Sequence, residues 1–384
     1  MIANTVRALN TGMFYNCKNL IKLLANDSHP SIKSSGGGYI FKDTNEFVLG
    51  CKSAIIPNYI TSIRIGAFYG CTGLTSISIP SSVTSIGNKA FRDCTNLTSV
   101  IIPDSVKTLG ERAFANNINL ISVEVGQSIT SIGPYTFYGC SNLTSAEVGR
   151  DVTSIGEYAF RGTSKLKNIT LPNGLISIDQ CAFASSGITE IDIPDSVTTI
   201  NQQAFYNCTS LTKVNIGKGF KTYGIGVFAN CKNLSSIVVN KDNATFKSEN
   251  NCLIKKANNS LVLGCKTSII PSSVTTIADY AFYGNGLTSL SIPDSVTGIG
   301  KEVFRECSEL ASISIGSGVK KIGPNAFKNC SKLTSVTFSN PTGWTVTTSS
   351  TATTGDAVTI STTDLSANAT LLKTTHVSKY WNRA

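Results

Sequence analysis

A phenylalanine recurs along this chain at intervals of 22 or 23 residues, and this period limits the possible folds more than any other feature. The recurring residues are Phe14, Phe68, Phe91, Phe114, Phe137, Phe160, Phe183, Phe205, Phe228, Phe282, Phe304 and Phe327. Two intervals are longer and measure 54 residues each. A fixed period of this length over most of a chain indicates a solenoid, in which each repeat packs against its neighbours.

Each repeat carries only four or five apolar positions. In the repeat that begins at Leu74, Ile77 and Ile79 alternate as residues on one face of a β-strand do. A Pro or Gly ends this strand, and Val83 and Phe91 follow on the return path. So few apolar side chains cannot form a core within one repeat, so successive repeats are expected to stack and fill a shared interior.

A small polar residue or a cysteine stands three positions after each recurring Phe. The predicted ladder at this position contains Cys17, Cys71, Cys94, Asn117, Cys140, Cys208, Cys231, Asn285, Cys307 and Cys330, with Thr163 and Ser186 in two further repeats. Because Asn, Thr and Ser replace Cys, we interpret the column as buried free thiols and other compact polar groups, and not as a disulfide framework. No C-x-x-C pair occurs, and His29 and His376 are the only histidines, so no metal or other cofactor is expected.

The pattern L-x-x-I-x-I-P-x-x-V-T-x-I-G-x-x-A-F-x-x-C, as written in residues 74–94, resembles the BspA-type leucine-rich repeats of bacterial surface proteins. The resemblance extends from about Val6 to Ser339. It implies a curved solenoid of about 12 repeats, with a parallel β-sheet on the concave face and little regular helix. It also implies secretion or surface display, and a role in adhesion to host or bacterial partners.

The solenoid is expected to occupy residues 1–340 and to contain two longer coils, near residues 24–57 and 240–271. Corresponding features of these coils lie 214 residues apart, and both contain V-L-G-C-K followed by I-I-P. We expect a protruding hairpin in each, with Gly36–Gly38 and Asn258–Asn259 as turns. Two interpretations stay open, that the hairpins are binding loops or that they are inherited variants of the repeat. Pairing of Cys252 with Cys265 is also left open.

Both ends of the chain depart from the full repeat. Val6 and Leu9 are already in phase with later repeats, so the chain begins in mid-repeat, and a signal peptide and an N-terminal cap are expected upstream. Residues 341–384 lose the period and are rich in Ser and Thr. They are predicted to form a C-terminal cap of one or two strands and a short helix from about Leu365. A disordered linker is the alternative.

A binding surface is predicted on the concave face. In L-x-x-I-x-I, the second and fourth residues after the Leu point away from the core because alternate strand residues face opposite sides. Most of these positions carry Ser or Thr. The exception is a central charged group made of Glu124, Glu147, Glu190, Asp192 and Lys213. The acidic side chains could attract a basic protein segment or a cation; alternatively, they only keep an exposed sheet soluble.

No catalytic motif is found, so the chain is not expected to be an enzyme. The net charge of +10 comes from scattered basic residues, so no nucleic-acid partner is expected. No apolar run approaches the ~20 residues that span a bilayer. We therefore predict a monomeric, extracellular or surface-attached adhesion scaffold that recognises a protein or glycan. The alternatives are a rigid spacer that displays another domain and a cytoplasmic protein-interaction module.

Overall fold

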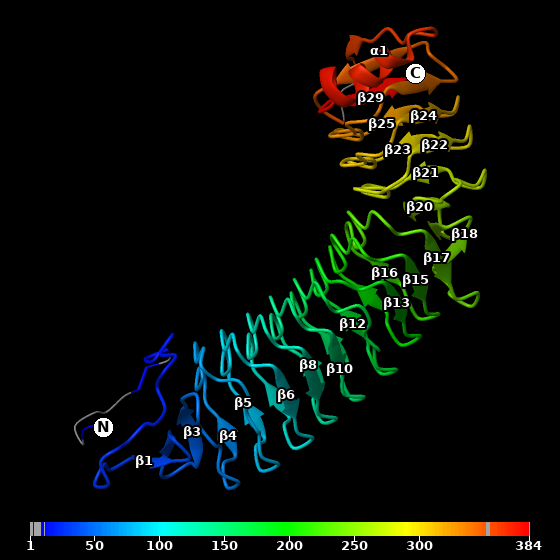
Figure 1. Ribbon diagram of the computed structural model, residues 1–384. Helices are drawn as coiled ribbons and strands as arrows, with labels where there is room; N and C mark the ends of the chain where they lie inside the picture. The colour runs from blue at the N-terminus through cyan, green and yellow to red at the C-terminus, as the bar shows by residue number, and fades with distance from the viewer. Residues whose placement is uncertain (1–2, 4–8, 11, 351–353, 384) are drawn as a thin grey trace. The chain divides into compact units, whose positions relative to one another are not determined.

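The computed structural model describes residues 3, 9–10, 12–350 and 354–383 (Figure 1). Val6, one basis for the predicted start in mid-repeat, lies outside these residues. The chain divides into unit 1, Met1–Ile188, and unit 2, Thr189–Ala384, and each is treated by itself below. Both are stacks of coils joined by parallel strands, with one short α-helix among the described residues, so the predicted repeat solenoid is confirmed.

Unit 1 presents strands on two sides of its coils. The longer strands form a parallel sheet of β6 (Ser99–Ile102), β8 (Ser122–Val125) and β10 (Ser145–Glu147). The two-residue strands are β4 (Ser62–Ile63), β5 (Ser85–Ile86), β7 (Thr108–Leu109), β9 (Ser131–Ile132), β11 (Ser154–Ile155) and β12 (Ser177–Ile178). An antiparallel meander precedes them, formed by β1 (Ile32–Ser35), β2 (Gly38–Phe41) and β3 (Glu46–Leu49).

Unit 2 repeats this plan. Its longer strands form two parallel sheets, one of β13 (Glu190–Ile193), β15 (Lys213–Ile216) and β17 (Ser236–Val239), the other of β22 (Ser289–Ile292), β24 (Ser312–Ile315) and β26 (Ser335–Phe338). The short strands are β14 (Thr199–Ile200), β16 (Thr222–Tyr223), β21 (Thr276–Ile277), β23 (Gly298–Ile299) and β25 (Lys321–Ile322). Its meander consists of β18 (Phe246–Glu249), β19 (Cys252–Lys255) and β20 (Ser260–Leu263).

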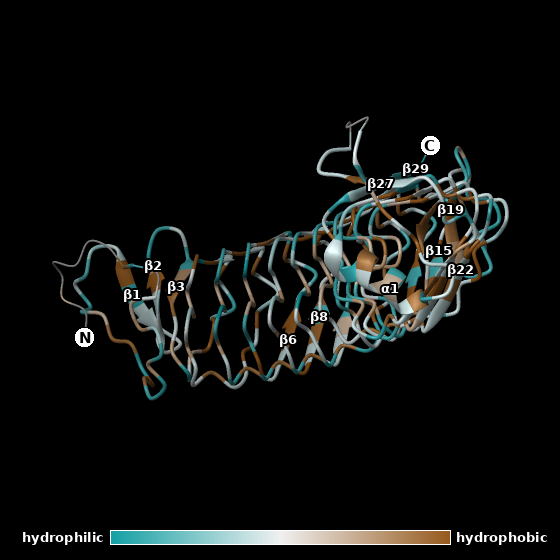
Figure 2. Cartoon of the chain, turned by 90° about the horizontal axis from the view of Figure 1, so that it is seen from above, coloured by the Kyte–Doolittle hydropathy of each residue, from teal (hydrophilic) through white to brown (hydrophobic). Residues whose placement is uncertain are grey.

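The alternation of the longer strands decides which side chains enter the core. In β6, Val100 and Ile102 are buried while Ser99 and Ile101 are exposed. Val100 lies opposite Val123 of β8, so equivalent apolar residues of successive coils form continuous columns. Figure 2 shows the resulting alternation of apolar and polar residues along the stacked coils of unit 1. In this arrangement each coil buries its apolar side chains against the neighbouring coil, because one coil alone cannot cover them.

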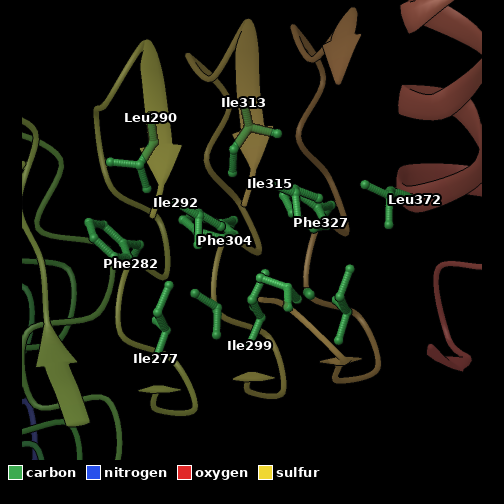
Figure 3. Packing of buried hydrophobic residues seen from close by; sticks show 14 of the residues in the cluster. Ile277, Phe282, Leu290, Ile292, Ile299, Phe304, Ile313, Ile315, Phe327 and Leu372 are labelled. Atoms are coloured by element: carbon green, nitrogen blue, oxygen red, sulfur yellow. The ribbon is translucent and has the colours of Figure 1, made fainter. Parts of the chain in front are cut away.

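The recurring phenylalanines form the central column of the core. In unit 1 the rings of Phe68 and Phe91 lie 4.9 Å apart between centroids, and Phe91 and Phe114 lie 5.0 Å apart, in stacked geometry. The backbone follows the same spacing, since the Phe91 N–H donates to the Ala113 carbonyl of the next coil at 2.8 Å. Figure 3 shows the equivalent column of unit 2, with Phe282, Phe304 and Phe327 in line.

The turn around each phenylalanine requires left-handed backbone two residues before and two residues after the ring. Around Phe91 these residues are Lys89 and Asp93, with φ of 58° and 59°. Asn and Gly tolerate this conformation best, which explains why one of them so often precedes the ladder residue. The Asn side chains also connect coils, since Nδ2 of Asn230 donates to Oδ1 of Asn207 at 2.6 Å.

Each of the two longer coils carries a three-stranded meander, whereas the sequence predicts a single hairpin. In unit 1, Gly36–Gly37 forms the turn between β1 and β2; in unit 2, Asn258–Asn259 lies between β19 and β20. The turn predicted in unit 1 is therefore the first loop of its meander, whereas the turn predicted in unit 2 is the second loop. The third strand pairs in parallel with the next short strand, so the meander is continuous with the solenoid. Cys252 and Cys265 are both free thiols.

The described residues 341–350 and 354–383 pack over the last coil of unit 2. They contain β27 (Trp344–Thr347), β28 (Asp356–Ala357), α1 (Leu365–Thr370), the π-helical turn η1 (Leu371–Thr375) and β29 (Tyr380–Arg383). Trp344 and Trp381 are each 2% exposed. Leu372 lies beyond Phe327 in line with the core columns (Figure 3). The Nδ2 atom of the buried Asn368 donates to the Val336 carbonyl at 3.0 Å, which attaches this segment to β26.

The glycine of V-L-G-C-K provides a test of this packing. A Cβ at Gly264 would overlap the ring of Phe282, which is itself stacked on Phe304 with 5.3 Å between centroids. We expect Gly264→Ala to lower the free energy of unfolding by about 1–3 kcal/mol, because the ring has no free space to enter. Denaturant unfolding followed by circular dichroism measures this change.

Gly298→Ala is the matched control, because nothing lies within 4 Å of a Cβ at Gly298. Equal loss of stability in the two variants would contradict the close fit of Phe282 against Gly264.

Candidate functional site

The solvent-exposed side of β6, β8 and β10, here called the long-strand face of unit 1, carries two columns of side chains. One column is Ser99, Ser122 and Ser145, and the other is Ile101, Glu124 and Glu147. These positions face away from the core, as the strand alternation predicts. Most of this surface is therefore small hydroxyl groups, and its distinctive part is the second column.

Glu124 and Glu147 lie directly opposite each other on neighbouring strands. Both are exposed, and neither takes part in an ion pair among the described residues. Ile101, in register with Glu124, is 63% exposed. The structure thus brings together two of the predicted site residues and adds an apolar neighbour. Parallel strands lie ~4.8 Å apart, so the two carboxylates repel each other across the sheet.

The predicted site residues of unit 2 are arranged differently. Glu190 of β13 lies opposite Lys213 of β15, and Asp192 lies opposite Asn215. Nδ2 of Asn215 donates to Oδ1 of Asp192 at 2.5 Å. Here each acidic side chain has a basic or amide neighbour on the next strand. The charges of this sheet are therefore balanced locally, whereas those of the Glu124–Glu147 pair are not.

The sheet of β22, β24 and β26 in unit 2 presents columns of hydroxyl groups. A hollow of about 470 Å³ lies over this sheet and is lined mainly by serines. Oγ of Ser314 donates to Oγ of Ser291 at 2.9 Å, so part of the hydroxyl capacity is used within the column. At one end stands Ile269, which is 70% exposed.

Sequence reasoning missed a groove of about 540 Å³ in unit 1, where the chain enters the longer strands. Its lining includes Asn96, Asn119 and Asn142, together with Ile121, which is 50% exposed. Nδ2 of Asn142 donates to Oδ1 of Asn119 at 3.2 Å. The Asn residues recur with the repeat, and this periodicity is the signal in the sequence that points to an amide column.

The ladder cysteines use their thiols as hydrogen-bond donors to the phenylalanine turn of the preceding coil. Sγ of Cys94 donates to the Phe68 carbonyl at 3.0 Å, and Sγ of Cys330 donates to the Phe304 carbonyl at 3.0 Å. Burial raises the pKa of Cys140 to about 12, and the pKa of Cys330 to the same value. These thiols remain protonated at neutral pH, where they are poor nucleophiles and poor metal ligands.

Two members of the predicted ladder depart from this pattern. Cys17 is exposed, although its turn is joined to the coil of Cys71 by the Asn16 N–H, which donates to the Gly70 carbonyl at 2.9 Å. Asn117 is fully buried, yet neither polar atom of its side chain has a hydrogen-bond partner. Asn285, at the equivalent position in unit 2, donates from Nδ2 to the Gly264 carbonyl at 3.2 Å.

The tyrosines that follow the recurring Phe pack over the turn. Tyr69 is half-buried, with the guanidinium carbon of Arg92 5.5 Å from its ring centroid. Tyr283 of unit 2 has the same relation to Arg305, at 5.7 Å. Such cation–π pairs cover the outer corner of the coil and leave little of the ring for a ligand.

In residues 12–350 and 354–383, and in the few described before them, no three His, Cys, Asp or Glu side chains gather in a way that could hold a metal ion. The only α-helix described is six residues long, and no described helix is long and apolar enough to cross a membrane.

The model of the BspA type leucine rich repeat region, which spans six copies of the repeat, matches residues 39–153, 130–256 and 262–373. These matches cover most of the solenoid, including the long-strand face of unit 1. The chain belongs to this family. Its coils are thus those of a BspA-type repeat protein, a scaffold found in bacterial surface proteins, and the resemblance read from the sequence is confirmed.

Solved structures of bacterial leucine-rich repeat proteins share the BspA-type fold seen here. A protein from Bacteroides ovatus is 28% identical, with a TM-score of 0.62 over 85% of this chain and 81% of that one. A protein from Eubacterium ventriosum is 30% identical, with a TM-score of 0.52 over 57% of this chain and 60% of that one. A leucine rich cell surface protein from Faecalibacterium prausnitzii is 25% identical, with a TM-score of 0.56 over 82% and 96% of the chains. The search of curated proteins found no match.

Asn117 offers a direct test of the BspA-type ladder. We expect Asn117→Cys to raise the free energy of unfolding by about 1–2 kcal/mol, because it replaces an amide without partners by the thiol that other coils carry. Denaturant unfolding measures the change. Asn285→Cys is the control and should bring no gain, because the amide of Asn285 is hydrogen-bonded. A gain of the same size in both variants would show that hydrogen bonding of the amide is irrelevant.

Thiol reactivity gives a second test. We expect iodoacetamide at pH 8 to modify Cys17 in the folded protein and to leave the eleven buried cysteines unmodified. The thiolate is the reacting form, and burial both raises the pKa of the thiols, as for Cys140, and blocks access to them. Peptide mass spectrometry before and after unfolding locates the modified residues. Equal labelling of Cys17 and Cys140 in the folded protein would contradict the buried ladder.

Proposed function

We propose that this chain is a non-enzymatic binding scaffold of a bacterial surface or secreted protein, and that it recognises a basic segment of a protein partner through the long-strand face of unit 1. The observation that carries this proposal is the in-register pair of Glu124 and Glu147, exposed and without an ion pair among the described residues. The similarity to the cell surface protein of Faecalibacterium prausnitzii supports the proposed location.

The electrostatics of the pair favour a cationic partner. Like charges directly opposite each other on neighbouring strands destabilise a sheet, so the bound state gains free energy when a Lys or Arg side chain lies between them. The chain as a whole has a net charge of +10. The acidic pair is therefore a negatively charged site on a chain with a positive net charge. A basic partner is attracted to this site and repelled by the basic residues elsewhere.

A protein segment fits this surface better than a neutral glycan. The face offers an exposed apolar side chain, Ile101, beside the two carboxylates, whereas Tyr69 and Tyr283 take part in cation–π pairs. Protein interfaces commonly combine an apolar contact with charge complementarity at its rim. A glycan ligand would instead be expected to use exposed aromatic rings.

The double variant Glu124→Gln/Glu147→Gln tests the proposal. The probes are an array of extended peptides with Lys or Arg at alternate positions among Ser and Thr, and immobilised extracellular-matrix proteins. We expect the intact chain to bind the basic peptides, and the double variant to bind them about tenfold more weakly, since two charge contacts are lost. Binding should also weaken as salt is raised.

Glu190→Gln/Asp192→Asn in unit 2 is the control pair, because its neighbours already include Lys213 and Asn215. It should leave binding unchanged. Equal losses in the two double variants would overturn the assignment to unit 1. If the chain binds none of the probes, the spacer interpretation replaces this proposal.

A further inference from the structure

A hollow of about 410 Å³ adjoins Glu147 in unit 1. The apolar part of its lining comes from Ala146, Val148, Leu171 and Pro172, and the polar part comes from Glu147, Arg150, Thr170 and Asn173. The volume lies within the range of ordinary ligand pockets, which combine mostly apolar walls with a few polar groups. A local departure from the repeat pattern lies at this hollow.

Ala146 is that departure. It occupies the inward position of β10, where β6 and β8 carry Val100 and Val123. The smaller side chain leaves space between its coil and the next one. The parallel sheet of β6, β8 and β10 also ends here, with β10 at its edge, although the following coil supplies Ile169 at the same repeat position.

The spacing of the backbone shows the same separation. A Cβ at Gly174 would lie 3.7 Å from the Arg150 carbonyl oxygen of the preceding coil. At the equivalent glycines of unit 2, Gly219 and Gly318, a Cβ would overlap the preceding carbonyl. At this corner the backbones of the two coils are thus farther apart than at the equivalent corners of unit 2. The widening is local, because the same two coils stack closely at Phe160 and Phe183, with 5.3 Å between ring centroids.

The chemistry of the hollow points to a long aliphatic cation. The apolar walls suit a methylene chain, and the carboxylate of Glu147 suits the charge at its end, an arrangement that lysine side chains adopt when they bury the stem and keep the ammonium in solvent. Arg150 does not neutralise Glu147, because its ion pair is with Asp151, at 3.9 Å, and its side chain is 82% exposed. Glu124 adds a second carboxylate on the adjacent strand.

We propose that this hollow is an anchor pocket for a lysine side chain of the partner, carried on an extended segment that lies across the long-strand face of unit 1. This proposal rests on the proposed function and deepens it, because it assigns the recognition of the basic segment to one pocket and one residue type. The lysine stem contacts Leu171 and Val148, and its ammonium lies between Glu147 and Glu124.

Methyl NMR of the intact chain, labelled at Ala, Val and Leu, tests the pocket. The probe is a blocked heptapeptide of alternating Thr and Ser with a central lysine, compared with peptides that carry norleucine or glutamate at the centre. We expect the lysine peptide to shift the methyl signals of Ala146, Val148 and Leu171, the norleucine peptide to do so several-fold more weakly, and the glutamate peptide to leave them unchanged. Free cadaverine at the same concentration should cause smaller shifts than the lysine peptide, because it lacks the flanking residues that contact the long-strand face.

Ala146→Val is the decisive variant, since valine stands at this position in the two preceding coils and the protein should fold with an unchanged or higher unfolding midpoint. It should abolish the shifts at Val148 and Leu171. Glu147→Gln should reduce binding of the lysine peptide to the level of norleucine, whereas Glu190→Gln in unit 2 should have no effect. Shifts that persist in Ala146→Val, or equal shifts with cadaverine and peptide, would overturn the pocket.

The two proposals fail in distinguishable ways. If Glu124→Gln/Glu147→Gln weakens binding of the basic peptide array while Ala146→Val leaves it unchanged, the anchor pocket is wrong and the acidic binding face stands. If neither variant changes binding, both proposals are wrong.

Discussion

A single coil of about 23 residues is too small to form a hydrophobic core. The core forms between coils, where equivalent phenylalanines of successive coils contact each other. The rings of Phe91 and Phe114 stack with 5.0 Å between centroids, close to the distance that parallel strands require. The same step therefore satisfies the ring contact and the hydrogen bonds of the backbone. Side chains at equivalent positions on the surface therefore follow one another at the same spacing from coil to coil.

This constraint explains the least variable parts of the repeat. The left-handed backbone after the ring favours Gly or Asn there, and the ladder thiols donate to the carbonyl of the preceding phenylalanine, as Cys94 does to Phe68. Where a meander interrupts the regular coil, the backbone that meets the ring is a glycine, Gly50 or Gly264, because the aromatic ring lies against it. The stability of this fold thus depends on the regular spacing of its coils.

A partner must be recognised by side chains that do not take part in the stacking of the coils. Side chains on the long-strand face do not contribute to the stack, so a change there costs little stability and alters what the face can bind. The acidic pair of unit 1 is a change of this kind. Ala146 differs in that it lies within an inward column, and a hollow lies beside it on the surface. The replacement of one larger apolar side chain in a column can in this way leave space between two coils that otherwise stack closely.

The period of the chain, read alone, determined the solenoid, its inward and outward columns and the exposure of Glu124 and Glu147, because a regular apolar pattern can bury itself only in stacked coils. It also showed that the two long coils share one design. Three features required the tertiary structure. The predicted hairpins are three-stranded meanders, because the middle strand, β2 or β19, pairs on both sides, whereas the sequence pointed to only one turn in each long coil. Asn117 and Cys17 break the ladder, because burial and hydrogen bonding depend on what the adjacent coil presents. The hollow beside Glu147 follows from the spacing between coils, which is a sum of many contacts and cannot be read from the identity of Ala146 alone.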